Sequence, residues 1–182
     1  MSLKADIENG QPAANQFSAE DVAAILRERQ WLPSAPQPEW DAWLATAAAL
    51  LGPQAPDRAA LADLLSLIFQ YDARAIQQSL DCHAVMARHA ARDVIRLLAN
   101  LILDGPEVDS DRFKQIVSTL KEKLNCGGRE LFHPVRLSLA GRIGDGELDR
   151  VILLLDSAAA LPFRTPVKGT RRRMLEFCSA LD

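Results

Sequence analysis

Apolar residues recur at intervals of three and four positions along most of the chain, and no segment alternates steadily between apolar and polar residues. The first pattern predicts amphipathic α-helices, and the second would be needed for half-buried strands. Turns that contain proline or glycine separate the apolar segments, so many of the helices are expected to be short. The sequence therefore predicts an all-α protein, built as an irregular multi-helix bundle.

Capping residues predict where several helices begin. Ser18 is followed three positions later by Asp21, a capping box in which an aspartate takes the usual glutamate or glutamine position. Asp57 can cap a third helix, after a second one that carries the apolar face Trp40 to Leu51. Ser110 is expected to cap the helix that follows the break "DGPEVDS".

The pattern also predicts an organisation of the chain. We expect a short helix near residues 72–80 and one long helix over residues 83–103. A division near the "DGPEVDS" break would separate an N-terminal helical subdomain, residues 18–104, from a C-terminal helical subdomain, residues 105–182. Residues 1–17 are expected to form a flexible lead-in.

The stretch "GRELFHPVRLSLAGRIGDGEL" is unusually rich in glycine and arginine. Asn125 and Gly127 or Gly128 should end the preceding helix. A helix of about two turns should begin near Pro134, because proline is tolerated in a first turn. Gly141 should end this short helix, and "GDG" should form a tight turn before the next one. A last helix is expected over residues 168–181.

Composition narrows the class of protein. The chain has 182 residues, of which 48% are hydrophobic and 25% charged, as in ordinary globular proteins. No apolar run reaches the roughly 18 residues of a membrane span, and the N-terminus lacks the apolar region of a secretory signal. The expected location is the cytoplasm, with no membrane partner.

Motifs for catalysis and for metals are missing from the sequence. There is no GxSxG, HExxH, P-loop or GxGxxG, so we expect a protein that is not an enzyme on its own. Cys82, Cys126 and Cys178 form no CxxC pair and no cluster with histidine, so neither a metal site nor a disulfide framework is expected. No cofactor is predicted.

Charge is distributed unevenly. Residues 1–111 carry 8 Lys and Arg against 16 Asp and Glu, whereas residues 112–182 carry 13 against 8. A basic C-terminal half favours an anionic partner, and arginines beside glycine turns suit an RNA loop, because the guanidinium pairs with phosphates and base edges. The alternative is a solvated basic face.

The segment Leu124–Asp156, "LNCGGRELFHPVRLSLAGRIGDGELDRVILLLD", resembles the C-terminal anticodon-binding region of bacterial-type glutamyl-tRNA synthetases. That region reads as "LF", then "PLR.ALTG", then "PEL" or "PGL" and an aliphatic helix. The matching residues are Leu131, Phe132, Pro134, Arg136, Leu139, Gly141, Leu148, Val151, Ile152, Leu154 and Leu155. The resemblance implies an α-helical cage that grips the anticodon loop of tRNA, either as an excised domain or as a stand-alone paralogue.

The resemblance also implies the site. Arg136, Gly141 and Leu148 are the matching candidates for RNA contact. The basic residues around them complete the expected RNA-binding set: Arg129, Arg142, Lys168 and Arg172. Ala140, Gly146 and Asp149 depart from the family pattern, and an acid at Asp149 would repel a nearby phosphate. Arg136 has an alternative role, a buried pairing with a carboxylate that holds the helices together.

Two functions follow from these observations. The first is a tRNA-binding module without catalytic activity, since no nucleotide-binding sheet, HIGH-like or KMSKS-like sequence is present. The second is a protein-interaction module that retains the fold but has lost tRNA reading, which the acidic N-terminal half and the departures from the family pattern favour.

Overall fold

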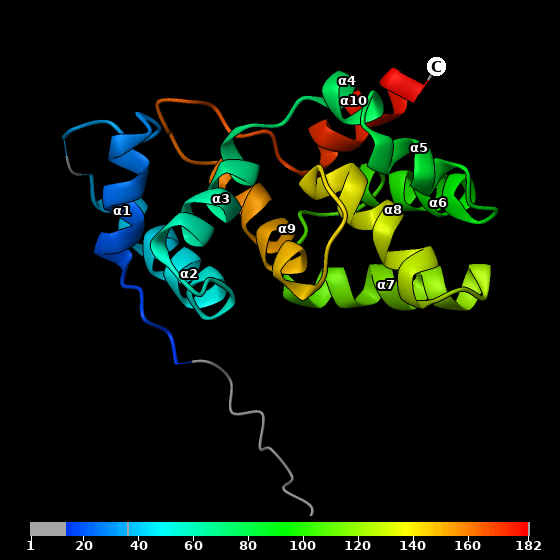
Figure 1. The fold of residues 1–182 in the computed structure, drawn as a ribbon, viewed down its shortest axis with the longest axis horizontal. Helices are drawn as coiled ribbons and strands as arrows, with labels where there is room; N and C mark the ends of the chain where they lie inside the picture. Colours follow the sequence, from blue (N-terminus) through cyan, green and yellow to red (C-terminus); the bar gives the residue numbers. More distant parts are fainter. Residues whose placement is uncertain (1–13, 36, 182) are drawn as a thin grey trace, which may run out of the picture.

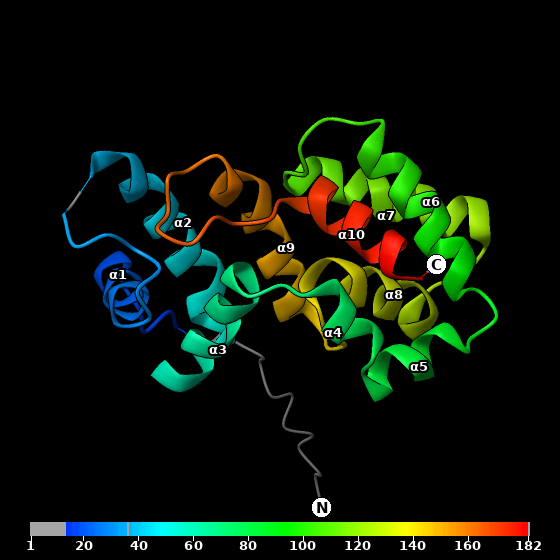
Figure 2. The ribbon, with the colours of Figure 1, turned by 90° about the horizontal axis from the view of Figure 1, so that it is seen from above.

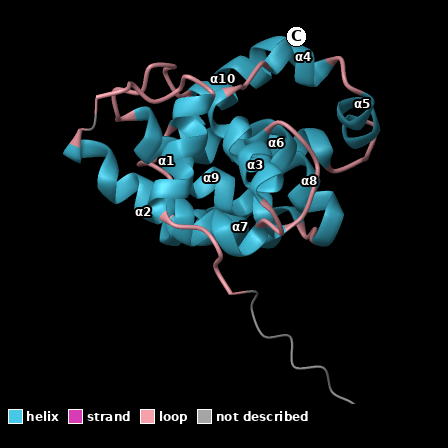
Figure 3. Cartoon of the chain, turned by 60° about the vertical axis from the view of Figure 1, so that its left-hand side comes forward, coloured by secondary structure: helices cyan, strands magenta, loops and turns pink. Residues whose placement is uncertain are grey.

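A computed structural model describes residues 14–35 and 37–181, and in these ranges the chain is all-α, as predicted. Ten α-helices and two short 3-10 helices account for the secondary structure of the described residues, and Figure 3 contains no strand. Among the same residues, no helix is both long and apolar enough to cross a membrane.

The helices divide into two groups along the long axis of the molecule (Figure 1). One end holds α1 (Ala19–Glu28), the 3-10 helix η1 (Pro38–Trp40), α2 (Asp41–Leu51), η2 (Gly52–Gln54) and α3 (Arg58–Phe69). The other end holds α4 (Ala73–Gln77), α5 (Leu80–Met86), α6 (Ala91–Leu103), α7 (Ser110–Leu124), α8 (Gly128–Ala140) and α10 (Thr170–Leu181). Helix α9 (Gly146–Ala159) lies between the two groups in Figures 1 and 2.

Helix packing follows this arrangement. Helix α9 contacts α2 and α3 on one side and α8 on the other, whereas α10 packs on α4, α6 and α8. The loop after α9 returns toward the first group, where the Arg164 amide donates to the carbonyl of Trp31 at 2.9 Å. Helices from before residue 105 thus pack against helices from after it at both ends of the molecule. The division into residues 18–104 and 105–182 stays a prediction.

Several predicted caps are confirmed. Ser18 and Asp21 form the capping box of α1, and the Asp57 carboxylate accepts the amide of Ala60 at the start of α3. Asn125 ends α7 with a φ of 48°, and Gly141 ends α8 with a φ of 90°. The left-handed conformation explains why asparagine and glycine stand at these two positions.

The predicted cap at Ser110 is wrong by one residue. The Asp109 carboxylate accepts the amide of Arg112 at 2.8 Å, so Asp109 is the cap and Ser110 is the first residue of α7. Both residue types cap helices well, and an aspartate has the further advantage that its charge interacts favourably with the helix dipole.

The single long helix predicted over residues 83–103 is also wrong. Helix α5 ends at Met86, the chain turns through residues 87–90, and α6 starts at Ala91. No proline or glycine lies in this turn, so local propensity does not cause the break. The turn lets α5 pack on α8 while α6 packs on α7, α8 and α10, and tertiary burial outweighs the preference for a continuous helix.

Helix α8 is longer than predicted, because it begins at Gly128 and carries Pro134 in its interior. A proline there leaves the carbonyl of residue 130 without its helical donor. Glu130 is exposed in the first turn, where water can take the donor's place, so the loss is small. Leu131 and Val135, one turn apart and fully buried, hold the extended helix against the core.

Most of the predicted lead-in, residues 1–17, lies outside the described residues. The described end of it contacts the body of the protein. The Asn15 side chain donates to the carbonyl of Ala48 at 3.0 Å, and the Phe17 side chain packs against the core.

Candidate nucleic-acid interface

Arg136, the arginine that matches the "PLR" element of the synthetase region, points from α8 toward α9. Its Nε and Nη2 donate to the two carboxylate oxygens of Asp149 at 2.8 and 2.9 Å, and its Nη1 donates to the carbonyl of Gly144 at 2.8 Å. The residue is only 9% exposed. This is the carboxylate pairing that the sequence left open as the alternative role of Arg136, and Asp149 is its partner.

The pair with Arg136 gives a structural role to Asp149, which departs from the family pattern. A two-pronged pair between a guanidinium and a carboxylate is a strong, directional contact, and here it joins α8 to the first turn of α9. The third contact ties the same side chain to the connecting turn. An RNA group that is to contact the guanidinium must therefore compete with Asp149.

Gly141 and Leu148 have structural positions. The amide of Gly141 donates to the carbonyls of Arg136 and Leu137, which closes the C-terminal end of α8. A Cβ at Gly141 would lie 3.3 Å from the Ile76 side chain. Both the positive φ and this close approach therefore disfavour a larger residue. Leu148 is completely buried, so an RNA contact there requires the chain to open.

Three other members of the predicted set are already paired within the chain. Arg142 forms an ion pair with Asp63 of α3 at 2.8 Å. Lys168 and Arg172 share the carboxylate of Glu176, at 2.7 and 3.0 Å. Such pairs on a partly exposed surface are weak, so they compete with a strong anionic ligand but do not exclude it.

Arg129 differs from the rest of the set. It lies in the first turn of α8, and its side chain is exposed. Among the described residues, none forms a hydrogen bond or an ion pair with its guanidinium. The structure thus separates the basic residues of the predicted set. Arg129 and Arg136 lie on α8 and Arg142 in the turn after it, whereas Lys168 and Arg172 lie just before and at the start of α10.

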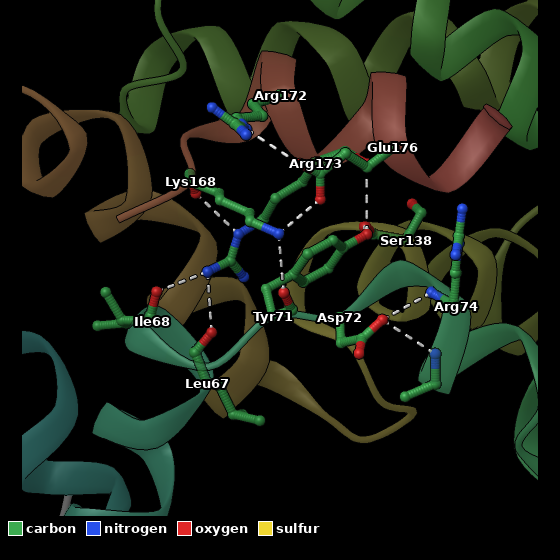
Figure 4. Close-up of polar contacts among 11 residues, drawn as sticks. Leu67, Ile68, Tyr71, Asp72, Arg74, Ser138, Lys168, Arg172, Arg173 and Glu176 are labelled. Atoms are coloured by element: carbon green, nitrogen blue, oxygen red, sulfur yellow. Dashed lines mark hydrogen bonds and ion pairs between the residues drawn. The ribbon is translucent and has the colours of Figure 1, made fainter. Parts of the chain in front are cut away.

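Sequence reasoning missed the role of Arg173. This residue is completely buried, and its guanidinium donates to four main-chain carbonyls, of which Figure 4 labels those of Leu67, Ile68 and Lys168. The acceptors are Leu67 and Ile68 at the end of α3, Leu139 at the end of α8, and Lys168, at distances of 2.7 to 3.0 Å. No carboxylate lies within ion-pair distance of Arg173 in the part of the chain that the structure describes.

Arg173 is stabilised by helix ends in place of an acid. The last carbonyls of a helix lack helical donors and carry partial negative charge, so a cation there satisfies both needs. Its guanidinium also lies 4.5 Å from the centre of the Tyr71 ring. We call Tyr71, Lys168, Arg173 and Glu176 the α10 junction, since these residues attach α10 to the ends of α3 and α8.

The α10 junction perturbs its ionisable groups. Burial lowers the pKa of the Arg173 guanidinium to about 10, although Tyr71, Asp156 and Glu176 act in the opposite direction. Burial also raises the pKa of the Tyr71 phenol well above its ordinary value. The Tyr71 hydroxyl donates to the carbonyl of Ser138 at 2.6 Å. Both groups keep their protons at neutral pH, which is the state that their contacts require.

A signal for this role exists in the sequence. The buried residues of α10 are Thr170, Arg173, Met174 and Phe177, which follow the spacing of an inward helical face. A cation in the middle of such a face must find acceptors inside the protein. The run "RRR" hides this position, because three consecutive arginines read as a solvated basic patch.

Asp156 fixes the start of α10. Its carboxylate accepts the amide of Thr170 at 2.7 Å, the hydroxyl of Thr170 at 2.8 Å and the amide of Val108 at 2.7 Å. One side chain of α9 therefore holds both α10 and the loop before α7. Beside it lies an open cavity of about 840 Å³, with the half-exposed Leu175 on its wall.

Comparisons with known proteins agree with the resemblance. The family model described as the anticodon binding domain matches residues 12–159. A glutamate–tRNA ligase 2 from Syntrophus aciditrophicus (strain SB) is 30% identical over 100 residues, which cover 55% of this chain and 21% of the ligase. A glutamate–tRNA ligase from Carboxydothermus hydrogenoformans (strain ATCC BAA-161 / DSM 6008 / Z-2901) is 27% identical over 105 residues, 58% of this chain and 20% of the ligase.

The two matched regions are thus about a fifth of each curated relative. No solved structure matches the chain. The helices that carry the family match are α1 to α9, and α10 lies beyond the matched residues.

Proposed function

Since the chain belongs to the anticodon binding domain family, we propose that it is a tRNA-binding module that contacts the anticodon loop. The single observation that carries this proposal is the family match, which includes α8, α9 and the turn between them. The two glutamate–tRNA ligases support a glutamate tRNA as the partner. In this proposal the chain acts in the cytoplasm, without a cofactor or a metal.

The proposal includes no catalysis by the chain alone. The relatives are ligases, but the matched part is about a fifth of each of them. An aminoacylation assay with glutamate, ATP and tRNA is expected to give no product with this chain. A measurable rate of product formation would contradict this part of the proposal.

The binding experiment is a titration of labelled tRNA at two salt concentrations. Phosphate contacts release counterions, so the affinity should fall as the salt concentration rises. The anticodon stem-loop of a glutamate tRNA should bind more tightly than a hairpin of equal length with a different loop. If neither RNA binds at low salt, the chain is not a tRNA-binding module.

A protein-interaction module is the second candidate. The pairing of Arg136 with Asp149 favours it, because the arginine that matches the family is held by an acid of the same chain. The exposed Leu175 beside the open cavity offers an apolar contact. A purified partner that binds after nuclease treatment, and that Leu175→Asp releases, would support this function over RNA binding.

A further inference from the structure

One face of α8 combines basic and aromatic side chains. Arg129, Phe132, His133 and Arg136 are three, four and seven positions apart, which places them on the same side of the helix. Arg88 reaches this side from the turn after α5, and Lys121 reaches it from α7. We call these six residues the α8 face. They come from the turn after α5 and from the consecutive helices α7 and α8.

The contacts within the α8 face are close. The Arg88 Nη1 lies 2.9 Å from the His133 Nδ1 and donates to the carbonyl of Arg129 at 3.4 Å. The Lys121 Nζ lies 5.6 Å from the centre of the Phe132 ring, and the Arg136 guanidinium carbon lies 4.6 Å from it. These contacts bring the cations together without neutralising them, because neither an aromatic ring nor a neutral imidazole carries a negative charge.

The charge balance separates three cations of the α8 face from the paired members of the predicted RNA-binding set. Arg88, Lys121 and Arg129 have no carboxylate within ion-pair distance among the described residues. Arg142, Lys168 and Arg172 each have one. The face therefore keeps positive charge that the chain does not compensate internally.

The imidazole of His133 responds to this charge. Burial lowers its pKa, and the positive charges of Arg88, Arg129 and Arg136 lower it further. Asp145, in the turn before α9, acts in the opposite direction. Because an arginine always donates, its contact with the Nδ1 requires that this nitrogen be unprotonated. His133 thus stands as a neutral acceptor among three cations.

We propose that the α8 face is an RNA-binding surface, on which Arg88, Lys121 and Arg129 contact phosphates. This inference rests on the proposed tRNA binding and assigns it to a particular surface. Arginine and lysine pair with phosphate, and the half-buried Phe132 adds an aromatic ring beside them, the kind of group that unpaired bases stack on. Arg136 is buried under the face, where it contacts the Phe132 ring and pairs with Asp149.

The test compares single neutral substitutions on and off the face. Arg88→Gln, Lys121→Gln and Arg129→Gln each remove one cation of the α8 face. Arg164→Gln is the matched control, since Arg164 is exposed in the loop beside Trp31, in the other group of helices. Far-UV circular dichroism and thermal unfolding check that each variant is folded. Arg129→Glu serves as a second variant at an exposed position.

The expected result is quantitative. Each lost phosphate contact lowers the slope of log affinity against log salt by about 0.7 to 0.9, which is about a five- to eightfold loss of affinity at 0.1 M salt. The tRNA anticodon stem-loop should show this loss with each face variant, and more with Arg129→Glu. The control Arg164→Gln should bind as the unaltered chain does.

His133 provides a second readout. A bound phosphate favours the imidazolium, so binding should raise the pKa of His133 and take up a proton. The affinity of the unaltered chain should then rise as the pH falls from 7.5 to 6, and His133→Gln should remove this part of the pH dependence. Protonation of the Nδ1 would also release Arg88 from the imidazole toward the phosphate.

Two outcomes would overturn the inference. If the RNA binds but all three face variants bind as tightly as Arg164→Gln, the α8 face is not the contact surface, and tRNA binding still stands. If no RNA binds the unaltered chain at low salt, the proposed function fails and this inference fails with it.

Discussion

The α10 junction and the α8 face use arginine in opposite ways. At the junction, Arg173 is fully buried and gives its donors to four carbonyls of the same chain. On the α8 face, Arg129 is exposed, and Arg88 contacts an imidazole and a carbonyl but no acid. At the α10 junction the guanidinium donors of Arg173 bind carbonyls of the same chain. On the α8 face the positive charge of Arg88 and Arg129 has no acid within ion-pair distance among the described residues and can bind an anionic ligand.

The comparison shows that a basic sequence is not the same as a basic surface. The run of arginines that opens α10 has the densest positive charge in the chain. In the structure Arg173 is a structural residue, Arg172 pairs with Glu176, and Arg171 donates to the carbonyl of Leu103. The less conspicuous cations Arg88, Lys121 and Arg129 have no acid within ion-pair distance among the described residues.

The largest effect is expected at Arg173. Substitution Arg173→Met leaves several buried carbonyls without donors, so the free energy of unfolding should fall by about 3 kcal/mol or more. The control Arg172→Met removes an exposed i,i+4 pair and should change it by less than about 0.5 kcal/mol. Urea unfolding measures both. Equal losses in the two variants would remove the distinction between the α10 junction and an ordinary basic patch.

The next effect concerns the pair that supports the α8 face. Asp149→Ala leaves the guanidinium of Arg136 buried without its acid and should cost about 2–3 kcal/mol of unfolding free energy. The double variant Arg136→Met with Asp149→Ala should cost less than Asp149→Ala alone, because neither charge remains. A double-mutant cycle by urea unfolding gives the coupling. Additive losses would mean that the two residues do not depend on each other.

A smaller effect is expected at Tyr71. Tyr71→Phe keeps the ring beside Arg173 but removes the hydroxyl that donates to the carbonyl of Ser138. The unfolding free energy should fall by about 1 kcal/mol, the ordinary value of one buried hydrogen bond. Thermal and urea unfolding measure it, with tRNA affinity expected to stay unchanged. A loss of tRNA binding in a folded variant would link the junction to the ligand.

The smallest effect depends on pH. Burial acts to raise the pKa of Glu176, but hydrogen bonds from Lys168 and Arg172 bring it below its ordinary value of 4.5. A lowered pKa contributes stability above the ordinary value, and that stability is lost as the pH falls through the folded-state pKa. The stability difference between the unaltered chain and Glu176→Gln should therefore shrink below pH 4.5. Urea unfolding at pH 6, 5 and 4 would show a constant difference if the pair contributes nothing.

Much of the fold could be predicted from the sequence. The period of the apolar residues gives the helices, and Ser18, Asp57, Asn125 and Gly141 mark helix ends where the structure has them. The errors arose where burial outweighed local preference. A long helix is divided at residues 87–90, and α8 extends through Pro134, because each change brings apolar side chains into the core.

The candidate site was less predictable. The resemblance identified Arg136, but it gave no means of knowing that Asp149, a departure from the family pattern, is the partner of this arginine. Which cations pair with acids depends on how α3, α9 and α10 pack, and a one-dimensional charge count contains no such information. The spacing of Arg129, Phe132 and His133 was visible in the sequence, but Arg88 and Lys121 join them only in the folded chain.

The most direct measurement is a map of amide chemical shifts as a tRNA anticodon stem-loop is added to the labelled chain at low salt. We predict that the largest shifts fall at the α8 face, near Arg88, Lys121, Arg129 and His133. The α10 junction should change little, because its donors are already used within the fold. Shifts concentrated at the junction, or spread evenly over both groups of helices, would contradict the account.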